Sequence, residues 1–348
     1  MHEQALIQKE CTVKQAIEGL NESGLRILLV VNEEDELLGT VTDGDIRRAI
    51  LTGISVENKV TDIMNKNPIY VKKNEQDEVI KSLMIENNIL SIPVLENGKV
   101  IDLKVSDIII KTQKIPNTVV LMAGGYGKRL EPLTKKTPKP LIHVGNKPIL
   151  EIIIEKFKNE GFYNFYISTF YKSEMVKDHF QDGSKWNINI NYIEENMPLG
   201  TCGSLSLLKQ EKIQSPIIMM NCDVLTKLNF SNLLAFHKKN NNSVTSCITE
   251  YYQQIPYGVC EIEDQKVVKL TEKPVHNFFI NAGIYVINED IIRSLNENKP
   301  IDMTDIINRE ILNEKNVGAF PIHEYWIDIG RKDDLSNAKE IFKSTDKK

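Results

Sequence analysis

The amino-terminal third of the sequence contains an internal duplication, which constrains the fold more than any other feature of the chain. Each copy has the order helix, strand, polar turn, strand, helix, as judged from apolar spacing and turn residues. One copy alone would bury too little apolar surface, so we expect both to pack together as one domain. The first copy comprises a helix at Val13–Leu20, strands at Ile27–Val31 and Leu37–Val41 around the turn Asn32–Glu36, and a helix at Asp43–Leu51. The second comprises a helix at Glu78–Glu86, strands at Ser91–Leu95 and Lys99–Leu103 around the turn Glu96–Gly98, and a helix at Ser106–Lys111.

The order of elements changes after Thr112–Asn117, where Pro116 disfavours continuation of a helix. We place a domain boundary there and expect two domains, residues 1–115 and 116–348, each of ordinary size. From Thr118 onward strands alternate with helices, which predicts an open α/β sheet that binds ligands at the carboxyl ends of its strands. The expected elements are strands at Val119–Ala123, Asn164–Thr169, Ile188–Glu194 and Pro216–Met220, and helices at Ile149–Glu160 and Lys172–Phe180.

Composition excludes several classes of protein. The 348 residues are 41% apolar and 26% charged, as in ordinary globular chains, which argues against extended disorder. Because 43 Lys and Arg residues nearly balance 48 Asp and Glu residues, we expect no nucleic-acid partner and no membrane partner. Apolar stretches are far shorter than the ~18 residues of a membrane span. The five cysteines form no CxxC pair and the amino terminus lacks a signal-peptide pattern, so we expect a reducing, cytoplasmic compartment.

The duplicated region resembles a CBS domain pair, with the sharpest match at Gly39–Ile46. The resemblance implies an α+β domain that senses a regulatory nucleotide or mediates dimerisation, with Thr42 on phosphate and Asp45 on ribose. Free N–H groups at a helix start attract phosphate, and a carboxylate can accept both ribose hydroxyls. The alternative is that Thr42 is simply a helix cap. The second copy departs from the pattern, because Lys104 stands at the Thr position.

A glycine-rich loop follows the first strand of the second domain, with Gly124, Gly125 and Gly127 in four positions. Glycines let the backbone approach a ligand closely, and successive N–H groups can form an anion-binding concavity. Arg129 at the end of the loop can grip phosphate oxygens in a bidentate fork. The loop matches neither GxGxxG nor GxxxxGK[ST], so the dinucleotide and P-loop patterns both fail, and by itself it could be a bare turn.

The longer segment Leu121–Leu150, which includes Pro138-Lys139-Pro140, resembles the sugar-1-phosphate nucleotidyltransferases. This resemblance implies an α/β fold, a Rossmann-like mixed open sheet, that follows the CBS pair. It also implies that Arg129 and Lys139 are catalytic. The residues implied to bind the nucleotide are Leu121, Ala123, Gly124, Gly125, Gly127, Lys128, Gly200, Thr201 and Gly203.

The segment Glu194–Ser204 resembles the part of the family that reads the nucleobase through backbone groups. Its version of the motif is commonly associated with GTP, although Cys202 stands where alanine is usual. Gly200 and Gly203 would let the chain pass close to a flat ring. The alternative is an ordinary strand-to-helix turn that Thr201 caps.

Two carboxylates are candidates for a magnesium site. Asp223 directly follows a buried apolar strand, where a carboxylate is costly unless it is paired or bound to metal; it could instead cap a turn. The family usually has glycine where this chain has Cys222. The resemblance implies that Asp328, in the segment Tyr325–Gly330, is the second Mg²⁺ ligand.

The sugar phosphate is implied to bind at two further segments that resemble the family. In the first, Glu272 would contact sugar hydroxyls and Lys273 the phosphate, although such a Glu-Lys-Pro sequence alone is more typical of a solvated turn. In the second, Asn281 and Gly283 would form a sugar-binding turn, where Asn281 offers both a donor and an acceptor.

The implied reaction is attack of a sugar 1-phosphate on the α-phosphorus of an NTP, with release of pyrophosphate. The pairing of a CBS pair with this transferase resembles the guanylyltransferases that make GDP-glucosamine for legionaminic acid, so we expect GTP and glucosamine 1-phosphate as substrates. Alternatives are mannose- or heptose-1-phosphate guanylyltransferases and cytidylyl- or uridylyltransferases. A nucleotide-sensing regulator without activity is a different possibility, but it should have lost Arg129, Lys139 or an aspartate of the metal pair. We expect a homodimer or higher homo-oligomer.

Overall fold

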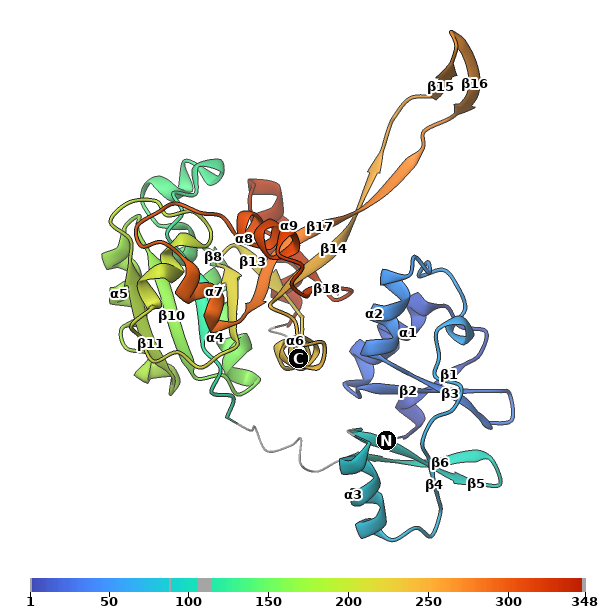
Figure 1. Ribbon diagram of the computed structural model, residues 1–348. Coiled ribbons are helices and arrows are strands. Elements are labelled where there is room, and N and C mark those ends of the chain that lie inside the picture. Colours follow the sequence, from blue (N-terminus) through green and yellow to red (C-terminus); the bar gives the residue numbers. More distant parts are fainter. Residues whose placement is uncertain (1, 88, 106–113, 346–348) are drawn as a thin grey trace. The chain divides into compact units, whose positions relative to one another are not determined.

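The chain divides into two compact units, residues 1–113 and 114–348 (Figure 1). This computed structural model describes residues 2–87, 89–105 and 114–345. The division lies close to Pro116, where the sequence places the boundary, and the helix expected at Ser106–Lys111 lies outside the described residues.

The first unit contains one three-stranded sheet for each copy of the duplication. The two copies share a core, in which Leu29 and Val31 of the first pack with Leu95 and Leu103 of the second. One domain built from both copies is therefore what the structure shows. The elements of the first copy are β1 (Leu6–Gln8), α1 (Val13–Ser23), β2 (Ile27–Val31), β3 (Leu37–Thr42) and α2 (Asp43–Leu51). Those of the second are β4 (Val71–Lys72), α3 (Asp77–Glu86), β5 (Ser91–Glu96) and β6 (Lys99–Val105).

The second unit is built on a seven-stranded mixed sheet, as the sequence predicts. Its strands are, in spatial order, β11 (Asn189–Glu194), β10 (Asn164–Thr169), β7 (Val119–Met122), β12 (Ile217–Asn221), β17 (Val275–Ile287), β14 (Val244–Gln254) and β18 (Val317–Pro321). All pairs are parallel except those that β17 makes with β12 and β14. Two short ladders complete the body, β8 (His143–Val144) with β9 (Lys147–Pro148), and β13 (Val224–Thr226) with β19 (Trp326–Asp328).

Helices cover both faces of this sheet because alternate strand residues point to opposite sides. Val119 and Leu121 of β7 pack into one core, and Val120 packs into the other. The helices of the first core are α4 (Ile149–Asn159), α5 (Ser173–Phe180), α6 (Phe230–Lys239) and α9 (Lys332–Thr345). Those of the second are α7 (Glu289–Ser294) and α8 (Met303–Leu312). Within the described residues, no helix is both long and apolar enough to span a membrane.

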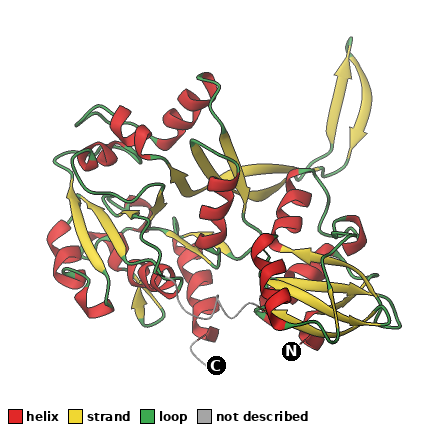
Figure 2. Ribbon diagram, turned by 60° about the horizontal axis from the view of Figure 1, so that its bottom comes forward, coloured by secondary structure: helices red, strands yellow, loops and turns green. Residues whose placement is uncertain are grey.

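A two-stranded arm extends from the sheet in both ribbon views (Figures 1 and 2). It comprises residues 249–280, which include the outer parts of β14 and β17 and, at its far end, β15 (Val259–Glu263) and β16 (Lys266–Thr271). Side chains are buried where β14 and β17 lie in the sheet and mostly exposed where they continue into the arm.

Candidate active site

The site lies where two parallel strands end side by side. β7 pairs with β10 on one side and β12 on the other, so the chain reverses its direction of winding at this point. Met122 at the end of β7 is opposite Asn221 at the end of β12, and Cys222 N donates to Met122 O at 3.2 Å. In open α/β sheets, such a switch point is where ligands bind.

Pairing of β13 with β19 brings the two predicted metal ligands together. Val224 is opposite Asp328 in this antiparallel ladder, and Ile329 N donates to Asp223 O at 2.8 Å. Trp326 Nε1 donates to Ala282 O at 2.9 Å, which ties β19 to the main sheet. Asp223 and Asp328, far apart in sequence, thus lie on adjacent backbone segments.

Both predicted catalytic cations lie beside this pair of carboxylates. Nζ of Lys139 is 2.6 Å from Oδ2 of Asp223, and the two side chains are only 12% and 24% exposed. Arg129 is exposed, and its guanidinium group packs against Gly330. A Cβ atom added to Gly330 would lie only 2.9 Å from Nη1 of Arg129. Two carboxylates and two cationic side chains therefore converge at the ends of β7 and β12.

Asp328 has an environment that suits a metal ligand better than a free carboxylate. Burial and the neighbouring Asp223 raise its pKa, against the opposing effect of Lys139 and Arg129. Its Oδ1 atom is buried and has no hydrogen-bond partner among the residues that the structure describes. Carboxylate oxygens are the ligands that Mg²⁺ prefers, so Asp223 and Asp328 fit this cation.

The glycine-rich loop is packed so closely that larger residues would not fit at two of its positions. A Cβ at Gly124 would lie 2.8 Å from Oε1 of Glu195, and one at Gly127, whose φ is +65°, would lie 2.7 Å from Cγ2 of Thr134. Gly125 has open space around it, as a backbone that faces a ligand requires. Of the other predicted nucleotide residues in this segment, Leu121 and Ala123 are buried and Lys128 is exposed.

Glu195, which the sequence analysis did not single out, connects this loop to the predicted base-binding segment. Its carboxylate accepts from Ser168 Oγ at 2.6 Å and from Leu199 N at 3.0 Å, and it lies against Gly124. No pattern in the sequence marks it apart from its position directly after β11.

Asp302 is a second residue that sequence reasoning missed. Its Oδ1 accepts from Thr201 N at 2.8 Å and from Thr201 Oγ1 at 3.1 Å, while Thr201 Oγ1 accepts from Met303 N at 2.9 Å. Gly200, with φ +76°, and Gly203 pass so close to residues 299–302 that a Cβ would clash with backbone oxygens. The spacing of Asp302 and Asp305 before an apolar helix is a capping-box pattern, but that pattern does not reveal the contact with Thr201.

The structure separates the two predicted sugar-phosphate segments. A Cβ at Gly283 would lie 2.8 Å from Nδ2 of Asn221, two residues before Asp223, so Asn281 and Gly283 lie near the carboxylates. Glu272 and Lys273 lie on the arm and are exposed.

In the first unit, Thr42 and Asp45 are joined by hydrogen bonds. Oδ2 of Asp45 accepts from Thr42 N at 2.8 Å and from Thr42 Oγ1 at 2.7 Å, and Arg48 also bonds to this carboxylate. This is the helix-capping arrangement that the sequence left open as an alternative. A nucleotide role for the two residues stays a prediction. An open hollow of about 350 Å³ in this unit, which neither residue lines, is formed by Leu37, Leu38, Lys66, Asn67, Pro68, Tyr70 and Leu95.

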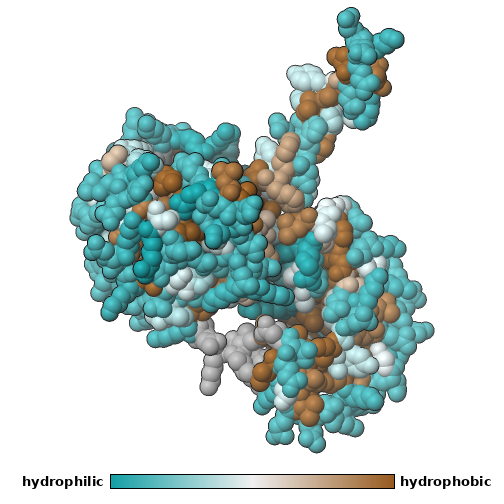
Figure 3. Space-filling view, in the orientation of Figure 1, coloured by the Kyte–Doolittle hydropathy of each residue, from teal (hydrophilic) through white to brown (hydrophobic). Residues whose placement is uncertain are grey.

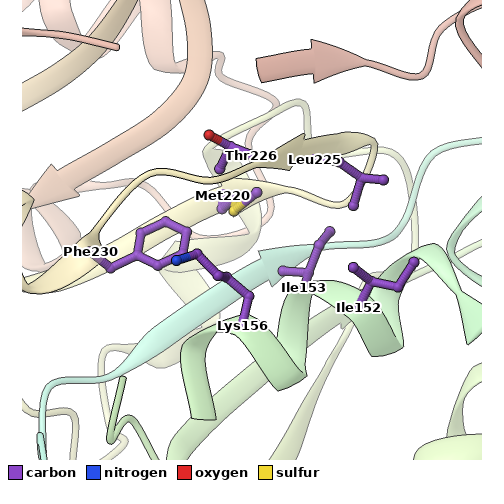
Figure 4. Close-up of a pocket in the computed structure, with 7 residues that line it drawn as sticks. All are labelled: Ile152, Ile153, Lys156, Met220, Leu225, Thr226 and Phe230. Atoms are coloured by element: carbon purple, nitrogen blue, oxygen red, sulfur yellow. The ribbon is translucent and has the colours of Figure 1, made fainter. Parts of the chain in front are cut away.

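A small cavity beneath β13 is unrelated to the site. Its volume is about 10 Å³, close to the minimum that holds one water molecule. Figure 4 shows its mostly apolar lining between α4, β12, β13 and α6, from Ile152, Ile153, Lys156, Met220, Leu225, Thr226 and Phe230. It contains none of the predicted site residues.

Comparison with known families decides the identity of the fold. The profile described as Nucleotidyl transferase matches residues 118–345. The chain belongs to the nucleotidyl transferase family. The CBS domain profile matches residues 2–52 and 60–103, one match for each copy of the duplication. Both resemblances seen in the sequence are thereby confirmed.

Relatives of this nucleotidyl transferase include mannose-1-phosphate guanyltransferases of yeasts. That of Schizosaccharomyces pombe is 30% identical over 234 residues, which cover 65% of this chain and 64% of the relative. That of Saccharomyces cerevisiae is 33% identical over 232 residues and 64% of each chain. The chain thus spans just under two thirds of the length of these relatives. A structure of HddC from Yersinia pseudotuberculosis complexed with GMP-PN is 25% identical, with a TM-score of 0.51, over 65% of this chain and 99% of that one.

Proposed function

We propose that the protein is a sugar-1-phosphate guanylyltransferase, which joins GTP to a sugar 1-phosphate and releases pyrophosphate. The observation that carries this proposal is the β13–β19 ladder, which sets Asp223 beside Asp328 at the switch point. Lys139 contacts Asp223 and Arg129 lies against Gly330, next to a loop in which Gly125 has open space for a phosphate. This is the charge pattern that transfer between two phosphates requires.

Catalysis in this site consists of positioning and charge neutralisation. The sugar phosphate is already an anion, so no side chain has to act as the nucleophile. Lys139 would hold the α-phosphate and Arg129 the departing pyrophosphate, so that two mutually repelling anions stay in line. Asp223 and Asp328 would hold Mg²⁺, which when bound would supply positive charge that offsets the charge of the phosphates.

The proposal also specifies which nucleobase and which sugar the enzyme uses. Guanine is supported by the Leu199–Gly203 segment and by the guanyltransferases among the relatives. Glucosamine 1-phosphate is supported by the pairing of the CBS domains with the transferase, which also suggests a role in legionaminic acid synthesis. Mannose 1-phosphate is supported by the names of the relatives.

One assay tests all parts of this proposal. Pyrophosphate release should be measured for each of four NTPs with a panel of hexosamine and hexose 1-phosphates, with and without Mg²⁺. We expect GTP, Mg²⁺ and one of the two sugars to give the highest kcat/KM. A preference for CTP or UTP would contradict the guanine assignment, and no release with any pair would contradict the proposal as a whole.

A further inference from the structure

The arm exposes large apolar side chains on both of its faces. Tyr251 is opposite Phe278, and the next pair along the ribbon is Tyr252 with Asn277. Because opposite residues share a face and successive pairs alternate, aromatic rings lie on both sides. Apolar patches are visible along the arm in Figure 3. The side chains that are 45–73% exposed are Tyr251, Tyr252, Tyr257, Ile262, Val267, Val268, Leu270, Val275, Phe278 and Phe279.

A two-stranded ribbon that exposes this much apolar surface to water is unfavourable in a folded protein. An isolated two-stranded hairpin is marginally stable in water, and contiguous exposed apolar surface marks a site of interaction. The arm is well formed nonetheless, with continuous pairing from Ile248–Asn281 to Gln254–Val275. We therefore expect its faces to be covered by a partner.

The arm also carries Lys273 away from the carboxylates of the candidate site, although the family resemblance implies that Lys273 binds the sugar phosphate there. β17 is extended between Val275 and Asn281, and at about 3.3 Å per residue this places Val275, two residues after Lys273, about 20 Å from Asn281. The hydrogen bonds that the structure describes for Lys273 join it to the other strand of the arm, through Tyr257 O and Gln254 Nε2. Its backbone has φ +46°, an uncommon conformation for lysine, at the bend between β16 and β17.

We propose that the arm docks on a second copy of this chain and places Glu272 and Lys273 in the sugar-phosphate site of that copy. This inference rests on the proposed function. The arm of each chain presents the two predicted sugar-phosphate residues away from the carboxylates of the same chain, so a second copy is the partner whose site they could complete. A two-fold dimer would let the two arms exchange and complete both sites at once.

Exposed apolar side chains at the mouth of the site are suited to receive the arm. Tyr126 and Met197 are each 44% exposed. They lie on the two loops that meet where Gly124 packs against Glu195. The ring of Tyr126 packs edge-to-face with that of Phe170, at a centroid distance of 5.7 Å.

Subunit complementation tests the exchange directly. Lys273→Ala and Asp223→Asn proteins should each be nearly inactive alone. In a mixed dimer, the intact arm of the Asp223→Asn chain would enter the intact site of the Lys273→Ala chain. Co-expression of the two variants should therefore restore about a quarter of the wild-type rate, since half of randomly formed dimers are mixed and one of their two sites is whole.

Two comparisons make the complementation result decisive. Lys266→Ala, an exposed arm lysine outside the predicted site, should retain wild-type activity. If the co-expressed variants show only the sum of their separate residual rates, the arm acts on its own chain and the inference is wrong. If the wild type itself releases no pyrophosphate with any substrate pair, the proposed function fails instead, and cross-linking then decides the inference.

Cross-linking from Cys260 needs no activity. This thiol is exposed on the arm, whereas Cys202, Cys222 and Cys247 are buried, so a Cys11→Ser protein can be labelled there with a maleimide photocross-linker. In mixed isotopically light and heavy protein, we expect light–heavy cross-links to the loops around Tyr126 and Met197. Cross-links only within one chain, or to other surfaces, would overturn the inference.

Discussion

At the scale of single residues, the ion pair between Lys139 and Asp223 positions a cationic group in the site before any anionic substrate binds. The pair is close, at 2.6 Å, and largely shielded from solvent, so each charge depends on the other. Removing one partner of such a pair leaves an uncompensated charge. The same lysine is placed to meet a phosphate once the substrate and a metal engage the carboxylates.

Lys139→Ala should therefore lower kcat by more than ~100-fold, because the charge that holds the α-phosphate is lost. Arg129→Ala should have a loss of the same order. Steady-state pyrophosphate release measures both effects, and circular dichroism checks the fold. Lys136→Ala, which removes a nearby exposed lysine, is the control and should retain the wild-type rate. Near-wild-type turnover in either Lys139→Ala or Arg129→Ala would refute the assigned mechanism.

Asp328→Asn should raise the stability of the fold while it abolishes activity. Burial and Asp223 raise the pKa of Asp328, so the ionised form costs folding free energy, and that cost grows as pH rises through the folded pKa. The neutral amide removes this cost, and a gain of ~1 kcal/mol would raise Tm by about 2–4 °C at neutral pH without Mg²⁺. Activity should be lost because a metal ligand is missing.

The control for this change is Asp178→Asn, an exposed carboxylate on α5, which should leave both Tm and activity unchanged. Thermal unfolding followed by circular dichroism at neutral pH compares the three proteins. A lower Tm for Asp328→Asn, with Mg²⁺ absent, would show that the carboxylate stabilises the fold instead.

At the scale of elements, the start of α8 positions the segment that is proposed to read the base. Asp302→Ala should cost about 1 kcal/mol of stability as a lost helix cap. It should also raise the KM for GTP about tenfold, equivalent to ~1.4 kcal/mol, because Thr201 loses two hydrogen bonds.

Asp305→Ala provides the matched comparison for Asp302→Ala. Asp305 belongs to the same cap and accepts from Asp302 N at 3.1 Å, but it has no described contact with Thr201. It should lose similar stability while the KM for GTP stays near the wild-type value. Equal changes in KM for the two variants would mean that the cap, and not the contact with Thr201, governs binding.

The elements up to Met220 were largely predictable from the sequence, whereas no helix or strand was assigned after that residue. The predicted bounds of β2, α2 and β10 coincide with those observed, because five apolar residues in a row, a Thr-Asp cap and clear turns mark them. The predicted helix start at Lys172 is one residue early, since this lysine has φ +54° and α5 begins at Ser173.

Contacts between distant segments were harder to predict than elements. The resemblance to a family named Asp223 and Asp328, but the ladder that joins them depends on tertiary pairing of two three-residue strands. Glu195 and Asp302 stand in no recognisable motif for binding, and their roles arise only from packing. The arm was not predicted, since the sequence analysis assigned neither β14 nor β17 as a strand.

At the scale of the whole molecule, the chain contains two units with separate cores, one assembled from the duplication and one around the seven-stranded sheet. Units with their own cores can unfold independently, so calorimetry should show two transitions. Val30→Ala, which truncates a fully buried side chain of the first unit, should lower only one of them and so assign it.

Ligand binding should then move the transitions selectively. A ligand at 100 times its Kd stabilises the unit that binds it by about 2.7 kcal/mol, which corresponds to roughly 5–10 °C in a unit of this size. Mg²⁺ with GTP should raise the transition of residues 114–348 by this amount, and Asp223→Asn should reduce that shift. A shift confined to the first unit, sensitive to Asp45→Asn, would instead identify a nucleotide-sensing regulator. If the nucleotide shifts both transitions and Asp45→Asn removes only the shift of the first unit, the first unit binds a regulatory nucleotide and the second unit binds the substrate.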